Sequence, residues 1–82
     1  MLELRPNCEC CDKDLPADAT DVLICSFECT FCVDCATNVL SGSCPNCGGE
    51  LVPRPRRPDN KLLNNPASIK RIYNPSLKSK SV

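Results

Sequence analysis

The chain has 82 residues, of which 41% are hydrophobic, and its only aromatic residues are two Phe and one Tyr. So short a chain with so few large apolar side chains forms at most one small domain, and domains of this size usually need cross-links or a bound metal. No apolar run approaches the roughly 18 residues of a membrane-spanning helix, so we expect a soluble protein without a membrane role.

A net charge of zero conceals two oppositely charged segments. The head, residues 1–52, carries nine acidic residues against Arg5 and Lys13, a formal charge of −7. Residues 53–82 carry eight Lys and Arg against Asp59, a formal charge of +7. We therefore expect an acidic domain followed by a basic extension.

Eight of the nine cysteines fall into four closely spaced pairs in the head: Cys8 and Cys11, Cys25 and Cys29, Cys32 and Cys35, Cys44 and Cys47. This spacing is typical of two zinc ions, the cofactor that we expect. A tetrahedral ion closed by four thiolates stabilises a fold and leaves no position for a substrate. Disulfides are disfavoured because the cysteine count is odd and the N-terminus lacks a secretory signal, so we expect a reducing, cytoplasmic location.

Three of the pairs predict their own local geometry. The segments 8–11 and 44–49 predict zinc knuckles, turns that direct two sulfurs at one ion, and Gly48 supplies the backbone freedom that the second knuckle needs. The pair in 32–35 lies at the N-terminus of one short helix that we expect near 33–41. A knuckle combined with a helix N-terminus has the ligand geometry of a treble clef.

The whole series over residues 8–47 resembles a RING-type zinc finger in the order of its ligand pairs, in Phe31 before the third pair and in the Cys-Pro-x-Cys of the fourth. The resemblance implies a small metal-stabilised domain with little regular secondary structure, a short β-hairpin and a cross-brace. It assigns the first and third pairs to zinc site one and the second and fourth to zinc site two: Cys8, Cys11, Cys32, Cys35 and Cys25, Cys29, Cys44, Cys47. Cys29 stands where most RING fingers have histidine.

The cysteine left over is Cys10, which lies between two ligands of the first knuckle. We interpret it as a spare cysteine without a role at the metal. The alternatives are that it exchanges with Cys11 as a ligand or that it is a redox-reactive thiol beside the metal.

A second resemblance rests on the stretch from Met1 to Pro16 together with the downstream Cys-Pro-Asn-Cys-Gly-Gly. These residues are similar to a bacterial family of short uncharacterised cysteine-rich proteins, over about residues 1–58. The resemblance implies a bacterial origin and a zinc-bound fold, and it implies no activity.

Beyond the head, prolines alternate with arginines in Pro-Arg-Pro-Arg-Arg-Pro, a composition that favours extended backbone. We interpret residues 53–60 as a linker. The tail, residues 61–82, is basic and polar, so we expect it to be disordered except for a short helix near 66–73, where Asn65 and Pro66 provide helix-start signals.

The apolar residues divide into two sets. The expected core consists of residues near the ligands or on the helix: Leu23, Ile24, Phe27, Phe31, Val39, Leu40 and Leu51. A second set in the tail forms a partner-binding stripe, unless it is disordered or packs on the head: Leu62, Leu63, Ile69, Ile72 and Tyr73.

These features favour a structural zinc protein that binds an unidentified protein partner. Catalysis is not expected, because the chain has no histidine and saturated cysteine ligation leaves the metal no hydrolytic position. The alternative is a nucleic-acid-binding accessory protein that uses basic residues beyond the head, with these contacts: Arg54, Arg56, Arg57, Lys70 and Arg71. The acidic head disfavours that alternative because it repels phosphate.

Two further readings are less favoured. Ubiquitin-ligase activity is disfavoured because Glu9 and Gly48 depart from the RING fingers that bind conjugating enzymes. An iron–sulfur cluster is indicated by Cys29-x2-Cys32-x2-Cys35 with Cys44-Pro45, but it would leave four paired cysteines without a role.

Overall fold

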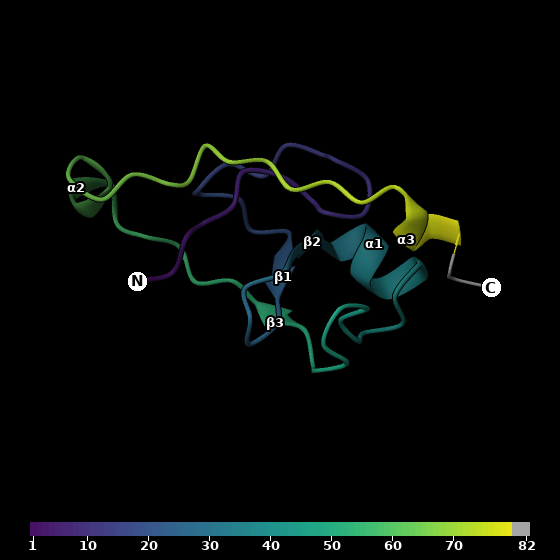
Figure 1. Cartoon of the computed structure of the whole chain (residues 1–82). Helices are drawn as coiled ribbons and strands as arrows, with labels where there is room; N and C mark the ends of the chain where they lie inside the picture. The colour runs from purple at the N-terminus through teal and green to yellow at the C-terminus, as the bar shows by residue number, and fades with distance from the viewer. Residues whose placement is uncertain (80–82) are drawn as a thin grey trace.

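The computed structural model describes residues 1–79, except for the side chains of the last two of them. Its centre is a three-stranded antiparallel sheet (Figure 1). The strands are β1 (Val22–Ile24), β2 (Thr30–Cys32) and β3 (Val52–Pro53), in the order β2-β1-β3. In the register of the sheet, Leu23 of β1 pairs with Phe31 on one side and with Pro53 on the other.

The hairpin of β1 and β2 forms where the sequence concentrates β-branched and aromatic residues, which suit a pleated, buried surface. Its loop closes through the N–H of Cys25, which donates to the carbonyl of Cys29 at 3.3 Å. Glu28 adopts a positive φ of 66° to make the turn. The predicted short hairpin is therefore confirmed, and β3 extends it to a sheet.

The first helix, α1 (Val33–Asn38), follows β2 directly. Cys32 is its N-cap, with a side chain that accepts from the N–H of Cys35, and Asp34 lies in the first turn, where the helix dipole favours an acid. The helix ends at Asn38, and the chain turns away at Gly42, whose N–H donates to the carbonyl of Ala36 and whose φ is +80°. The helix predicted near 33–41 is thus present and slightly shorter.

The core is centred on Phe31, which is fully buried between the sheet and α1. The side chain of Phe27, predicted to be part of the core, is 71% exposed. That prediction is wrong because the N–H of Phe27 donates to the sulfur of Cys25 in the tight hairpin loop, and the ring leaves the loop on the solvent side. Four buried aliphatic residues were not predicted: Leu4, Leu15, Val22 and Leu77.

The proline-rich segment interpreted as a linker is attached to the head. It begins with Pro53 in β3, and the side chain of Arg54 is buried and donates to the carbonyls of Arg5 and Pro16 at 2.9 and 3.0 Å. At its end, Asp59 begins the one-turn helix α2 (Asp59–Leu62), which has no buried residue.

The tail has no helix at 66–73, so that prediction is wrong. This segment is extended and returns along the head, and a one-turn helix, α3 (Ser76–Ser79), lies beyond it. The backbone of Ser68 and Ile72 bonds to the head and not to its own neighbours, and these contacts outweigh the weak helix propensity of a two-turn segment. The expected disorder of the tail stays a prediction, and residues 80–82 lie outside the described part.

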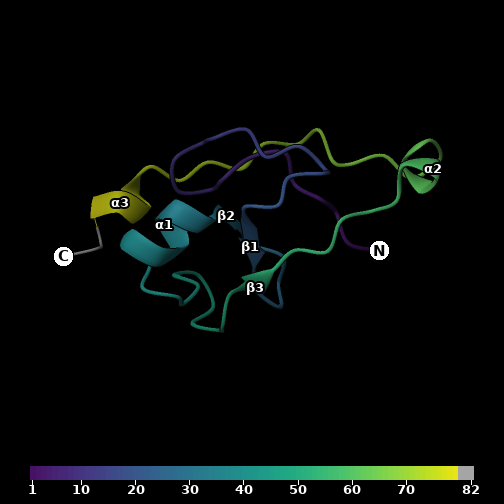
Figure 2. The same cartoon turned by 180° about the vertical axis from the view of Figure 1, so that it is seen from behind.

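The molecule measures 42 × 20 × 19 Å. The helix α2 projects at one end of the long axis, and α1 and α3 lie together at the other (Figures 1 and 2). Among residues 1–79, no helix is long and apolar enough to cross a bilayer.

Candidate metal centre

The first cluster contains Cys8, Cys11, Cys32 and Cys35, whose sulfurs all lie within 4.8 Å of one another. The first two come from the loop before β1, and the other two from the end of β2 and the first turn of α1. The sulfurs of Cys11 and Cys32 are 3.8 Å apart. Four sulfurs at the Zn–S distance of about 2.3 Å in a tetrahedron are separated by about 3.8 Å, so the cluster fits a zinc ion.

The loop that carries Cys8 and Cys11 is a closed turn. The N–H of Asp12 donates to the carbonyl of Cys8, and the N–H of Cys8 donates to the carbonyl of Lys13, both at 2.8 Å. Asp12 takes a positive φ of 64°, which brings the chain back on itself. The turn therefore directs both thiols to one side.

The second cluster contains Cys25, Cys44 and Cys47, which also lie within 4.8 Å of one another. The N–H of Gly48 donates to the carbonyl of Cys44 at 2.8 Å, and the positive φ of 77° at Gly48 permits this turn. The N–H of Gly49 then donates to the sulfur of Cys47 at 3.4 Å. Such N–H groups stabilise negative charge on sulfur.

Cys29, expected as the fourth ligand of zinc site two, lies beside this cluster and is not one of the three grouped sulfurs. Its thiol and its N–H both contact the sulfur of Cys25, and its own sulfur accepts from Nδ2 of Asn46 at 3.4 Å. Its role as a ligand stays a prediction.

Cys10 is fully buried and belongs to neither cluster. Its side chain interacts with the thiol of Cys35. The structure thus places the leftover cysteine next to site one without grouping it with the four sulfurs.

Burial makes three of these thiols hard to ionise without a cation. It raises the pKa of Cys8 to about 11 and the pKa of Cys44 to about 12, and it also raises the pKa of Cys35. At Cys25 burial acts in the same direction, but the N–H groups of Phe27 and Cys29 outweigh it and lower the pKa to about 7. A divalent ion would supply the positive charge that clustered thiolates need.

The two clusters are connected by Asn46, which sequence analysis missed. Its Nδ2 donates to Oε2 of Glu9 at 2.8 Å as well as to the sulfur of Cys29. Glu9, in the loop of site one, is only 6% exposed. No local pattern marks Asn46, because its partner lies 37 positions earlier in the chain.

A family model described as "Protein of unknown function (DUF1272)" matches residues 1–57, a segment that contains both clusters, the sheet and α1. The chain belongs to this family. An "Uncharacterized protein R02474" from Rhizobium meliloti (strain 1021) is 63% identical over 75 residues, which cover 92% of this chain and 89% of the relative. No solved structure gives a significant match.

These findings confirm the resemblance to a bacterial family of cysteine-rich proteins and the small fold with two cysteine clusters. The ligand set of a single iron–sulfur cluster is not brought together in this DUF1272 protein. Cys32 and Cys35 lie in the first cluster, whereas Cys44 lies in the second.

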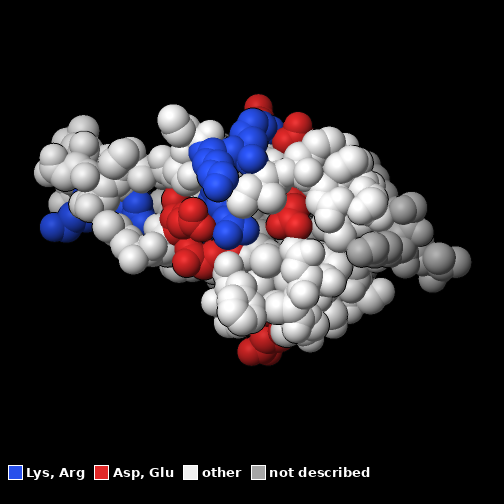
Figure 3. Space-filling view, viewed as in Figure 1, with Lys and Arg blue, Asp and Glu red and all other residues white. Residues whose placement is uncertain are grey.

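Of the basic residues predicted as partner contacts, some bond within the chain and the others are exposed to solvent. Arg54 is buried, Arg57 donates to the carbonyl of Asn65 at 2.6 Å, and Arg71 forms ion pairs with the head, so these three are engaged within the chain. Arg56 and Lys70 are exposed. On the face in Figure 3, basic and acidic side chains are interspersed and form no continuous basic surface.

Proposed function

We propose that this DUF1272 protein is a structural zinc protein that holds two Zn²⁺ ions and binds a protein partner in the cytoplasm. The observation that carries the proposal is the pair of sulfur clusters contributed alternately along the chain, which supports a cross-brace. A metal held in this way joins the loop before β1 to α1, and the hairpin loop to the turn at 44–47, so its contribution is to folding.

A non-enzymatic role is part of the proposal. Two sites each closed by four cysteines, with Cys29 as the fourth ligand of site two, leave the metals no open position. The cavity of about 560 Å³ near Asp18 and Arg57 has no cysteine in its lining, whereas a smaller one of about 280 Å³ is lined in part by Cys25. Protein binding is supported by exposed apolar side chains, which include Phe27 at 71% and Leu63 at 85% exposure. Nucleic-acid binding is not favoured, because Arg54, Arg57 and Arg71 are engaged within the chain.

The test of the metal proposal is native mass spectrometry of protein expressed without added metal, compared with its denatured mass. We expect two zinc ions per chain. One ion would contradict the cross-brace, and iron with sulfide would move the protein to electron transfer. Affinity capture with the zinc protein, against a metal-free control, tests partner binding, and capture of nothing above the control would contradict it.

A further inference from the structure

The strap, residues 65–77, returns along the head as an extended chain. Figures 1 and 2 show it beside the N-terminal loops. Every head residue that it contacts lies within the segment matched by the family model, which ends at residue 57. The surface under the strap therefore lies within the segment that the family model matches, and the strap follows that segment.

Backbone groups of the strap bond to the head at three places. The side chain of Asn7 bonds to both backbone groups of Ile72. Its Oδ1 accepts from the N–H of Ile72 at 3.4 Å, and its Nδ2 donates to the carbonyl of Ile72 at 3.0 Å. The N–H of Asn74 donates to the carbonyl of Glu9 at 2.8 Å, and that of Ser68 donates to the carbonyl of Glu3 at 2.9 Å. Such contacts do not depend on the side chains of the strap, so any extended peptide can make them.

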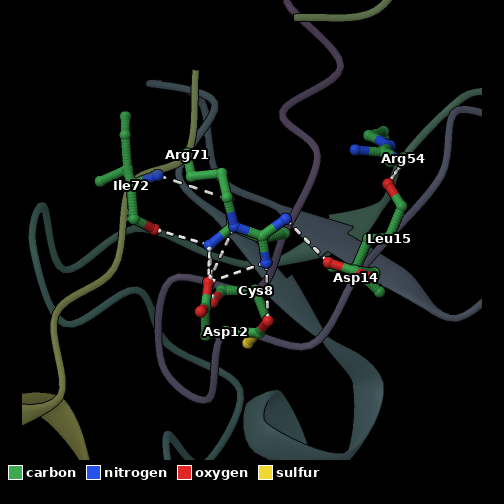
Figure 4. A network of polar contacts seen from close by, with 8 residues as sticks. Cys8, Asp12, Asp14, Leu15, Arg54, Arg71 and Ile72 are labelled. Atoms are coloured by element: carbon green, nitrogen blue, oxygen red, sulfur yellow. Dashed lines mark hydrogen bonds and ion pairs between the residues drawn. The ribbon is translucent and has the colours of Figure 1, made fainter. Parts of the chain in front are cut away.

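Arg71 is the first side-chain anchor of the strap (Figure 4). Its Nη1 lies 2.7 Å from Oδ1 of Asp14, and its Nη2 lies 2.9 Å from both Oδ1 and the carbonyl oxygen of Asp12. These contacts raise the pKa of Arg71, with Asp14 as the largest cause. The acidic head therefore presents a pair of carboxylates that selects a cation at this position.

Leu77 is the second anchor. It is 1% exposed and belongs to the core cluster that contains Phe31 and Ala36. Before Arg71 the strap exposes Ile69, at 94%, and Lys70 to solvent, and between the anchors Tyr73 is 50% exposed. Recognition is thus concentrated in one basic and one aliphatic residue, six positions apart.

The strap is held in a way that permits displacement. The two carboxylate side chains and Arg71 are each 40% exposed or more, and ion pairs at such exposure contribute little net stability. The strap is joined to the head through α2, which has no buried residue and projects from the molecule. Leu77 is the one fully buried residue among the described side chains of the strap, and segments with so few buried contacts open at low free-energy cost.

We propose that the head has a peptide-binding groove, formed by Asn7, Glu9, Asp12, Asp14 and the pocket of Leu77, which the chain's own strap occupies. The partner is an extended protein segment that carries Arg or Lys and, six positions later, Leu or a similar aliphatic residue. The strap is an internal competitor that such a segment displaces. This inference rests on the proposed protein-binding function and specifies its surface.

The test uses a fluorescein-labelled synthetic peptide with the sequence of residues 66–79, titrated into the full-length zinc protein and followed by anisotropy. In the wild type, the strap competes with the peptide at an effective millimolar concentration. Arg71→Glu in the protein weakens the binding of the strap to the head. We therefore expect this variant to bind the peptide at least about tenfold more tightly than the wild type. Lys70→Glu, an equal charge change at an exposed neighbour, should behave as the wild type.

A head-side variant provides an independent test, because the Asp14 side chain is 82% exposed and its substitution leaves the core intact. In Asp14→Lys the groove should prefer a peptide carrying Arg71→Glu over the native peptide, a reversal of the wild-type preference. If Arg71→Glu binds no peptide, or if Asp14→Lys shows no reversal, the groove is wrong.

Two outcomes separate this inference from the broader proposal. A partner captured equally well by the wild type and by Asp14→Lys would overturn the groove and leave protein binding in place. Peptide binding without any captured partner would support the groove while the partner proposal fails. Light scattering of Arg71→Glu mixed with Asp14→Lys is expected to show monomers, and a stoichiometric dimer would overturn the proposal in favour of strap exchange between copies.

Discussion

Arg54 lies where the proline-rich segment leaves β3, and it donates to three backbone carbonyls in two separate parts of the head. The acceptors are Arg5 at 2.9 Å, Pro16 at 3.0 Å and Leu15 at 3.5 Å, and the last contact is drawn in Figure 4. Burial lowers the pKa of Arg54, but an arginine stays charged at any physiological pH. The side chain therefore joins the N-terminal loops to the sheet.

Replacement of Arg54 by Met should destabilise the protein by about 2–4 kcal/mol, because buried carbonyls lose a charged donor. Chemical denaturation of the zinc protein, followed by circular dichroism, measures the change. Arg56→Met is the matched control, since Arg56 is exposed, and should change the stability by less than about 0.5 kcal/mol. Equal effects of the two substitutions would contradict a structural role for Arg54.

Among the elements, the two cysteine turns differ in their exposure to solvent. In the loop of site one, Cys8 is fully buried, whereas in the second turn Cys47 is exposed. A chelator has access to an ion at the second turn without opening the core. At site one, the same chelator requires movement of the loop that the strap also contacts.

Zinc should consequently leave in two phases when the protein is mixed with a chromophoric chelator, and the faster phase belongs to site two. Cys47→Ser should abolish the fast phase, and Cys8→Ser should abolish the slow phase. Cys10→Ser is the control, because Cys10 lies outside both clusters, and it should retain two ions and both phases. A fast phase that survives in Cys47→Ser would show that the assignment is reversed.

The elements near the cysteines are also those that the sequence predicts best. Ligand spacing and local turn chemistry are short-range signals, so the hairpin and α1 could be predicted close to their observed positions. The tail could not, because its order depends on Arg71 and Asp12, which lie 59 positions apart. Arg54 was missed for the same reason, since a buried arginine and an exposed one look alike in a basic, proline-rich segment.

At the scale of the whole molecule, the strap and site one share a loop. Asn7, Glu9 and Asp12, which hold the strap, lie next to Cys8 and Cys11, so their positions depend on the turn that carries the first ligand pair. A structural zinc site contributes an apparent ~10–16 kcal/mol to folding, more than the net stability of most small domains. Loss of the metal should therefore affect residues far from any cysteine.

Removal of zinc by a strong chelator should unfold the head and release the strap together. The amides of Ser68, Ile72 and Asn74 donate to acceptors in the head. We therefore expect these amides to lose their protection from hydrogen exchange at the same chelator concentration that abolishes the far-ultraviolet circular dichroism of the head. Arg71→Glu separates the two events, since it should expose the strap amides while the zinc content stays at that of the wild type. If these amides stay protected after chelation, the strap and its surface are held together without the metal. Binding of the strap would then not depend on zinc.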